Sequence, residues 1–231
     1  MQEFMLFSQI SPIRHDQVLQ ELAGVTAMQP VPICVQTLYY EQLRAEEAAS
    51  QKKQPHNGSQ KARQVQKLFR HIVNGEGQPW TVRTEDVPQA GVKDMISRPV
   101  DESAATHADL EKFREGGSWY KYITQSILLG HRFVHNNLVI RIARILTVPE
   151  GTGALEPLDA PLPNLDECRL LDMSGAYLCE VSVRVADPNN SMVTDAAKKE
   201  LMEFKAIMDG AVDLKVPGNR LSMDPRAKNA S

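Results

Sequence analysis

Residues 176–187 read AYLCEVSVRVAD, and this alternation of apolar and polar side chains is typical of a half-buried β-strand. One face of the strand would carry Tyr177, Cys179, Val181, Val183 and Val185, and the other face Glu180, Ser182 and Arg184. After a break at 188–191, apolar residues recur every three or four positions from Val193 to Ala211, as in an amphipathic helix. A short apolar run at 212–216 predicts a final strand. The C-terminal third is therefore predicted to be a helix packed on an antiparallel sheet.

Similar patterns recur along the rest of the chain. A helix is predicted at 15–22, with Gly24 as its left-handed cap, and the polar stretch 101–115 allows a short helix. Hairpin turns are expected at 74–77 and at 134–138. Further strands are predicted at 4–10, 33–40, 67–73, 80–83, 95–98, 119–129, 138–148 and 168–173. The strand at 138–148 is predicted to be the longest.

The spacing of these elements predicts the fold class. Most connections are too short for the crossovers that parallel strands need, so the sheet should be antiparallel. Closing such a sheet removes its unpaired edges, which favours a closed or nearly closed barrel. We therefore expect a predominantly antiparallel β fold, of the α+β type, in which helices flank the barrel or plug one end.

Two stretches without a strong pattern are expected to be loops within a single domain that spans residues 1–231. Residues 41–66 are rich in Glu, Ala, Gln, Lys, Asn and Ser, and are predicted to be a flexible insertion. Residues 149–166 contain several prolines and glycines and are predicted to be a second loop.

Composition limits the classes of function. The chain has 231 residues, 42% hydrophobic residues and a net charge of −3, which are ordinary values for a globular protein with no overall attraction to nucleic acid or anionic membranes. The N-terminus lacks the basic and long apolar regions of a signal peptide. The cysteines, Cys34, Cys168 and Cys179, are not at metal-ligand spacing and are expected to be free thiols. A reducing compartment, cytosol or nucleus, is therefore expected.

No motif predicts catalysis, a metal or a cofactor. Residues 151–153 read Gly-Thr-Gly but lead into prolines instead of opening a helix that could hold phosphate. His131 and His135 lie on a predicted strand and turn, so the helical spacing of a zinc site is missing. No Gly-x-Ser-x-Gly elbow is present. We expect no catalytic residue, no metal and no cofactor.

Several segments, in this order, resemble the family of Mediator of RNA polymerase II transcription subunit 18, most closely its filamentous-fungal form. They are 4–7 with 19–30, Trp80 followed by 86–91 (DVPQAG), 119–146, 201–216, and 220–226 (RLSMDPR). Two details depart from the family pattern. Gly218 and Asn219 replace the usual Asp before the tail arginine, and Pro225 stands where a small residue is common.

The resemblance implies a non-catalytic subunit of the Mediator head module. Such a subunit would act in the nucleus as part of a coactivator that links regulators to RNA polymerase II and the initiation machinery. It would bind subunit 20, which has a related barrel, and a C-terminal helix of subunit 8. The implied fold is an antiparallel barrel with flanking helices.

Two alternative functions follow from the same sequence. The family's barrel is similar to that of tunnel triphosphatases, which hold metal and triphosphate through inward Glu-x-Glu pairs and basic residues. This chain has no Glu-x-Glu, and Val181, Val183 and Ile140 are expected where such charges would lie. Arg141, Arg144 and Arg184 could hold phosphate, but no accompanying carboxylates are predicted to hold the metal. The second alternative is a nucleic-acid binder that uses the basic residues between Lys52 and Arg70.

Aromatic residues at 119–122 are the candidate partner-binding site. Trp119, Tyr120 and Tyr122 could line an apolar groove that accepts the helix of subunit 8, because aromatic side chains often anchor interfaces. Tyr120 and Tyr122 could instead be core residues of a strand.

Overall fold

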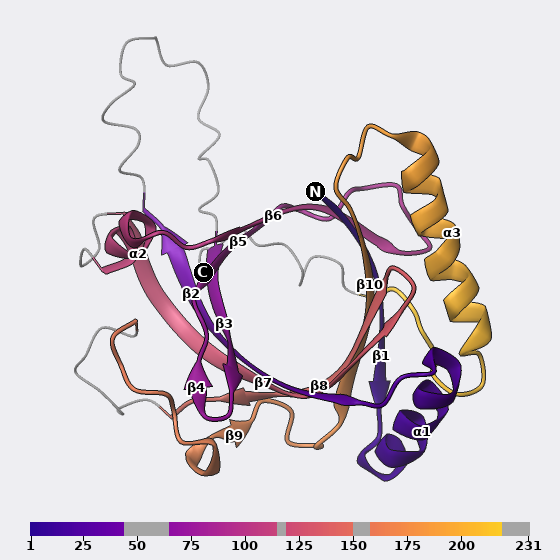
Figure 1. Ribbon diagram of the computed structural model, residues 1–231, viewed down its shortest axis with the longest axis horizontal. Coiled ribbons are helices and arrows are strands. Elements are labelled where there is room, and N and C mark those ends of the chain that lie inside the picture. The colour runs from indigo at the N-terminus through magenta and orange to yellow at the C-terminus, as the bar shows by residue number, and fades with distance from the viewer. Residues whose placement is uncertain (44–64, 115–118, 150–157, 219–231) are drawn as a thin grey trace.

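Eight antiparallel strands close into a barrel in the computed structural model, which describes residues 1–43, 65–114, 119–149 and 158–218 (Figure 1). The order around the barrel is β10-β1-β6-β5-β3-β2-β7-β8, and pairing of β8 with β10 closes it. The barrel strands are β1 (Gln2–Ile10), β2 (Val31–Gln42), β3 (Val65–Val73), β5 (Thr81–Glu85), β6 (Ile96–Ala104), β7 (Tyr120–His135), β8 (Leu138–Thr147) and β10 (Tyr177–Val185). The predicted antiparallel barrel is confirmed.

Two short strands and several helices complete the described part of the chain. They are β4 (Glu76–Gly77), β9 (Arg169–Leu170), α1 (His15–Thr26), α2 (His107–Arg114), α3 (Ser191–Ile207) and the 3₁₀ helices η1 (Pro12–Arg14) and η3 (Leu165–Glu167). Asn74 and Gly75, both with positive φ, turn β3 into β4. Asn136, with φ of 51°, lies in the turn between β7 and β8.

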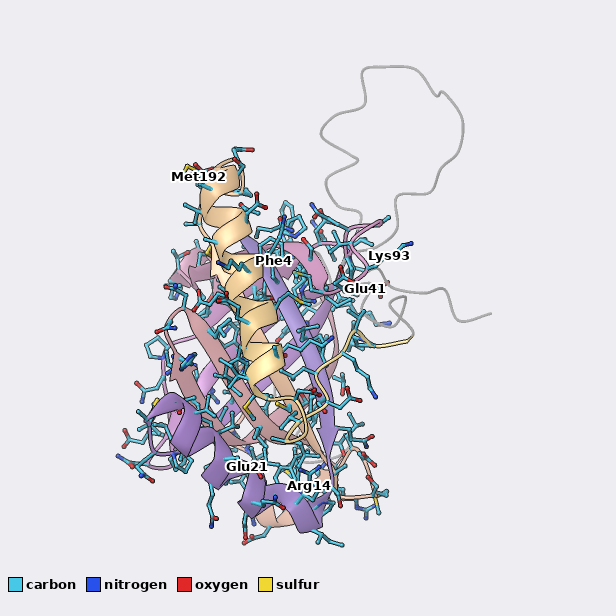
Figure 2. All side chains as sticks on the ribbon, turned by 90° about the vertical axis from the view of Figure 1, so that its right-hand side faces the viewer. Phe4, Arg14, Glu21, Glu41, Lys93 and Met192 are labelled. Carbon is cyan, nitrogen blue, oxygen red and sulfur yellow. The ribbon has the colours of Figure 1, made fainter. Side chains whose placement is uncertain are left out.

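The main hydrophobic core lies outside the barrel wall, between β1, β8 and β10 and the helices α1 and α3 (Figure 1). Phe4 of β1 lies under α3, while Met192 marks the end of α3 farther from α1 (Figure 2). The helix begins at Asn190, whose side chain accepts a hydrogen bond from the Val193 backbone N–H. Leu201 and Phe204 of α3 are almost fully buried against the strands.

A second, smaller hydrophobic cluster lies beneath α2 on another part of the outer wall. Leu38 and Tyr40 of β2 and Leu68 of β3 are fully buried there, and Phe113 of α2 packs on them. The barrel is thus covered by helices on two sides, and both apolar clusters are on its outer face.

The structure corrects several predicted elements. α1 continues past Gly24, and Ala27, with φ of 52°, is its left-handed cap. Among the described strands β7 is the longest, with 16 residues against 10 in β8, because it pairs with β2 from Tyr120 onward, before its pairing with β8 begins at Ser126. Residues 101–104 belong to β6, where they pair with β5.

Other corrections concern the predicted insertion at 41–66, the strand predicted at 168–173 and the run 212–216. β2 extends into the start of the stretch predicted as an insertion, and β3 begins at Val65, while 44–64 lie outside the described residues. The strand predicted at 168–173 is limited to Arg169 and Leu170. The run 212–216, predicted to be a strand, forms only one isolated bridge, between Lys215 and Phe7. Phe7 is available for this bridge because β6 pairs with β1 only as far as Met5.

Barrel interior and candidate partner-binding surfaces

Charged side chains gather in one part of the barrel interior, in contrast to the apolar clusters on its outer face. Strand register shows which residues face inward, because paired residues place their side chains on the same side. Glu3 of β1 is paired with Arg98 of β6 and with Arg184 of β10. Arg83 and Glu85 of β5 and Glu102 of β6 are on the same side of the sheet.

Glu3 is the centre of this buried network. It has no exposed surface, and its Oε2 accepts a hydrogen bond of 2.7 Å from Arg83 Nη2. Its Oε1 accepts one of 2.9 Å from Arg184 Nε, and Arg98 is also within hydrogen-bond distance. Burial alone would raise the pKa of Glu3, but the charges of the three guanidinium groups lower it below its usual range. Glu3 is therefore ionised inside the barrel.

Glu85 forms a second charged centre beside Glu3. It accepts hydrogen bonds from Lys67 at 2.7 Å, from Arg83 at 2.6 Å and from Arg98 at 2.7 Å. Although burial opposes ionisation, these positive charges lower the pKa of Glu85 to about 2. Arg83 and Arg98 each bind both Glu3 and Glu85, which joins the two centres into one network. Arg83 and Arg184 also bind Glu102.

This arrangement corrects the predicted direction of the strand faces. Val181 and Val183, expected to point into the barrel, face α3 instead, while Glu180 and Arg184 face inward. The reason is that the helices pack outside the wall and bury its apolar face. Inward carboxylates therefore do accompany the inward arginines, contrary to the prediction, although each is bound to a guanidinium group.

The aromatic residues at 119–122 divide into two groups. Tyr120 stacks on Phe113 at 4.2 Å between ring centroids, and Tyr122 meets Tyr40 edge to face at 5.7 Å. Both tyrosines are half-buried in the cluster under α2. Trp119 precedes β7, has 39% of its surface exposed, and is outside that cluster. Of the three predicted partner-binding residues, Trp119 is the most available to another molecule.

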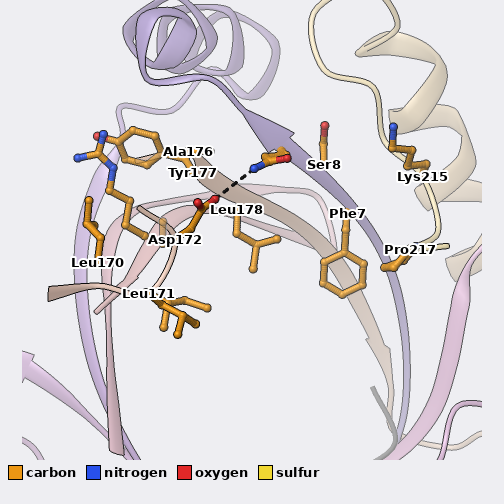
Figure 3. Close-up of a pocket in the computed structure, with 14 residues that line it drawn as sticks. Phe7, Ser8, Leu170, Leu171, Asp172, Ala176, Tyr177, Leu178, Lys215 and Pro217 are labelled. Carbon is orange, nitrogen blue, oxygen red and sulfur yellow. Dashed lines mark hydrogen bonds between the residues drawn. The ribbon is translucent and has the colours of Figure 1, made fainter. Parts of the chain in front are cut away.

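An apolar pocket of about 410 Å³ at one end of the barrel was not predicted from the sequence. Phe7, Leu171 and Leu178 surround the same space, and Pro217 borders it (Figure 3). Gln9 donates a hydrogen bond of 3.2 Å to Asp172, which holds the segment after β9 beside β1. The residues of this pocket come from β1, β8, β9, β10 and the C-terminal segment, so no local motif could have revealed it.

The C-terminal segment completes the wall beside this pocket. β6 pairs with β1 only as far as Met5, so the following part of β1 has no strand on that side. Lys215 fills the position by exchanging two backbone hydrogen bonds with Phe7, of 2.9 and 2.8 Å. The pocket therefore lies where the regular sheet gives way to this single bridge.

The described part of the chain, residues 1–43, 65–114, 119–149 and 158–218, holds no candidate for a metal site or a membrane-spanning helix. No group of three or more His, Cys, Asp or Glu side chains is placed there to hold a metal ion. None of the helices within these ranges has the length and hydrophobicity to cross a membrane. The three cysteines are free thiols, and burial raises the pKa of Cys179 to about 12.

Comparison with known sequences identifies the family. The family model described as Med18 protein matches residues 2–226. A Coccidioides immitis protein named Mediator of RNA polymerase II transcription subunit 18 is 29% identical, and the match covers 99% of this chain and 100% of that protein. A Yarrowia lipolytica protein of the same name is 23% identical with the same coverage.

Comparison with solved structures agrees with the fold. A chain in the structure of the Schizosaccharomyces pombe Mediator head module matches with a TM-score of 0.70 and 19% identity, covering 93% of this chain and 98% of that one. The Pyrococcus horikoshii protein PH1819 matches with a TM-score of 0.51 and 14% identity, covering 96% and 97%. At these identities the structures show a common fold only. The match of the family model over nearly the whole sequence goes further, and by it this chain belongs to the Med18 protein family.

Proposed function

We propose that this protein is a non-catalytic subunit of the Mediator head module and works in the nucleus as part of a coactivator of RNA polymerase II. The observation that carries this proposal is the family match over residues 2–226. The likeness of the whole barrel to a chain of the S. pombe head module supports it. The paired charges inside the barrel are consistent with a structural role, because each carboxylate of the network is already bound to arginine or lysine.

The partners in this proposal are Mediator subunits 20 and 8. Trp119 offers an exposed aromatic anchor at the edge of the barrel, and such side chains contribute strongly to interfaces. The pocket beside Phe7 and Leu178 offers a second apolar surface, suited to side chains of an amphipathic helix. The helix of subunit 8 would use one of these surfaces, and substitutions can distinguish them.

Co-expression with the same organism's subunits 20 and 8, followed by size-exclusion chromatography, tests the proposal. A stoichiometric complex at moderate salt is the expected result. Leu178→Asp, which places a charge in the pocket, and Trp119→Ala would each be compared with the unmodified chain. A folded chain that elutes alone, in the presence of partners shown to be competent, would contradict the assigned role.

The same purified protein tests the two other functions. Turnover of a triphosphate with Mn²⁺, abolished by Arg184→Ala, would indicate a phosphohydrolase. RNA or DNA binding that falls steeply with salt and disappears on deletion of 52–63 would indicate a nucleic-acid binder. The basic residues beyond that deletion include Lys67, which is bound to Glu85 inside the barrel, and Arg70, which lies over the ring of Trp80 at 4.3 Å.

A further inference from the structure

Two arginines lie directly opposite each other inside the barrel. Arg132 of β7 is paired in register with Arg141 of β8, and both side chains point inward with Glu180 of β10. Like charges at directly opposite positions destabilise a sheet unless something neutralises them. Arg141 is neutralised by an ion pair with Glu180. Arg132 makes no side-chain ion pair or hydrogen bond with any residue in the described part of the chain.

Hydrogen-bond donors at this place also exceed acceptors. The Nε atom of Arg141 is buried and has no hydrogen-bond partner among the described residues. Burial of such a donor costs free energy unless an acceptor is supplied. His71 of β3 lies near both arginines, and its partial burial, followed by the charges of Arg132 and Arg141, lowers its pKa. The region therefore has a positive potential and an unused donor.

The contrast with the rest of the interior is clear. Around Glu3 and Glu85, every inward lysine or arginine contacts at least one carboxylate. Arg132 is half-buried and contacts no carboxylate of a described residue. Among the described residues, the inward arginine that lacks a carboxylate partner therefore lies in the part of the barrel formed by β7 and β8.

This region is accessible to small solutes. His71 is exposed to solvent although its strand register directs it inward, so water reaches the interior at that level. Arg141 is paired with Glu180, and the next inward-facing pair along β8 and β10 is Ala143 with Leu178. Ala143 and Leu178 both line the apolar pocket. The pocket therefore lies one inward-facing pair away from the arginines.

We propose that the barrel binds a small oxyanion of the phosphate class between Arg132 and Arg141. Guanidinium groups donate paired hydrogen bonds that match the oxygens of such an anion. The anion would neutralise Arg132, accept a hydrogen bond from Arg141 and remove the repulsion between the two strands. This site is independent of the proposed role in Mediator, and the anion is a ligand, not a substrate.

Calorimetric titration of the full chain with orthophosphate, at constant ionic strength set by chloride, tests the site. Arg132→Gln is expected to weaken binding at least tenfold, roughly the loss of one charged hydrogen-bonding partner. Glu180→Gln removes the carboxylate that competes for Arg141, so it should tighten binding severalfold. The matched control is Lys199→Gln, which removes a positive charge from the exposed outer side of α3 and should leave affinity unchanged.

Equal affinity in the unmodified protein and in Arg132→Gln would overturn the proposal, as would the absence of saturable binding. Arg132→Gln should keep the fold, because it removes a repulsion and no attractive contact, and circular dichroism checks this. If it does not fold, Glu180→Gln decides the question, because unchanged or weaker binding in that variant would also contradict the site.

Discussion

Glu3 and Arg83 are 80 residues apart in the chain and form a buried ion pair of 2.7 Å inside the barrel. The strands that carry them, β1 and β5, are not neighbours in the sheet, because β6 lies between them. The contact therefore spans the inner face of the sheet, and it ties the N-terminal strand to the middle of the chain.

Removing the charge of Glu3 should destabilise the fold strongly. In Glu3→Gln, three guanidinium groups lose a shared partner in a buried place, and breaking one side of such a network costs about 3–5 kcal/mol. Urea unfolding at neutral pH measures the change. Glu203→Gln is the control, because the Glu203 pair with Lys199 is exposed and should contribute about 0–1 kcal/mol. Similar stabilities for the two variants would show that the network contributes little.

Acid should unfold the protein partly through Glu85. The pKa of this carboxyl is about 2 in the folded protein against an ordinary value of 4.5, so the unfolded chain binds the proton more tightly. The stabilisation is complete above about pH 5 and is lost as the pH falls towards 2, with a total on the order of 3 kcal/mol. Unfolding free energies measured from pH 6 to pH 2 should show this slope. A Glu85→Gln variant with an undiminished slope would assign it to other groups.

Two glycine substitutions should have opposite effects on stability. A Cβ atom at Gly130 of β7 would lie 2.1 Å from the backbone oxygen of Ile142, so β7 and β8 would have to move apart. We expect Gly130→Ala to cost about 2–3 kcal/mol. Gly24 is exposed within α1 and has no atom within 4 Å of the added methyl group, so Gly24→Ala should add about 0.5–1 kcal/mol. Thermal unfolding of both variants checks the difference in sign.

Trp119 and Tyr120 should separate binding from folding. Trp119→Ala is expected to leave the unfolding free energy within about 0.5 kcal/mol of the unmodified value, because the side chain is largely outside the core. It should weaken the complex with subunits 20 and 8 by at least 1 kcal/mol if it anchors the interface. Tyr120→Ala should destabilise the fold by roughly 2–3 kcal/mol through loss of its stacking on Phe113. Unchanged affinity in Trp119→Ala would move the interface elsewhere, first to the pocket.

The sequence was sufficient to predict an antiparallel barrel, because alternation and turn residues are local signals. The period of two also separated Glu180 and Arg184 correctly from Val181 and Val183. It could not tell which of these faces is inside, since both choices have the same periodicity. That depends on where α1 and α3 pack, and a wrong choice led to the expectation that valines would face the interior and that no carboxylates would accompany the arginines.

The candidate sites were predictable only where they are local. Trp119 is recognisable as an aromatic residue at a strand boundary, but its exposure depends on the position of α2. The opposed pair of Arg132 and Arg141 could have been found by extending the predicted hairpin across its turn and noting two like charges at matching distances. The pocket beside Phe7 could not have been found in this way, because it forms only when Lys215 lies beside β1, and Lys215 is over 200 residues from Phe7 in the sequence.

The place of β1 in the barrel has a consequence for biosynthesis. Gln2 pairs with Val185 on one side and with Pro99 on the other, so β1 is made before the other barrel strands but is among the last to gain both neighbours. While the ribosome is still translating the middle of the chain, the apolar side chains of this strand have no wall to join. Contacts so distant in sequence also slow folding. Nascent chains stalled before β10 should therefore be protease-sensitive and bind chaperones, and release should follow translation of that strand.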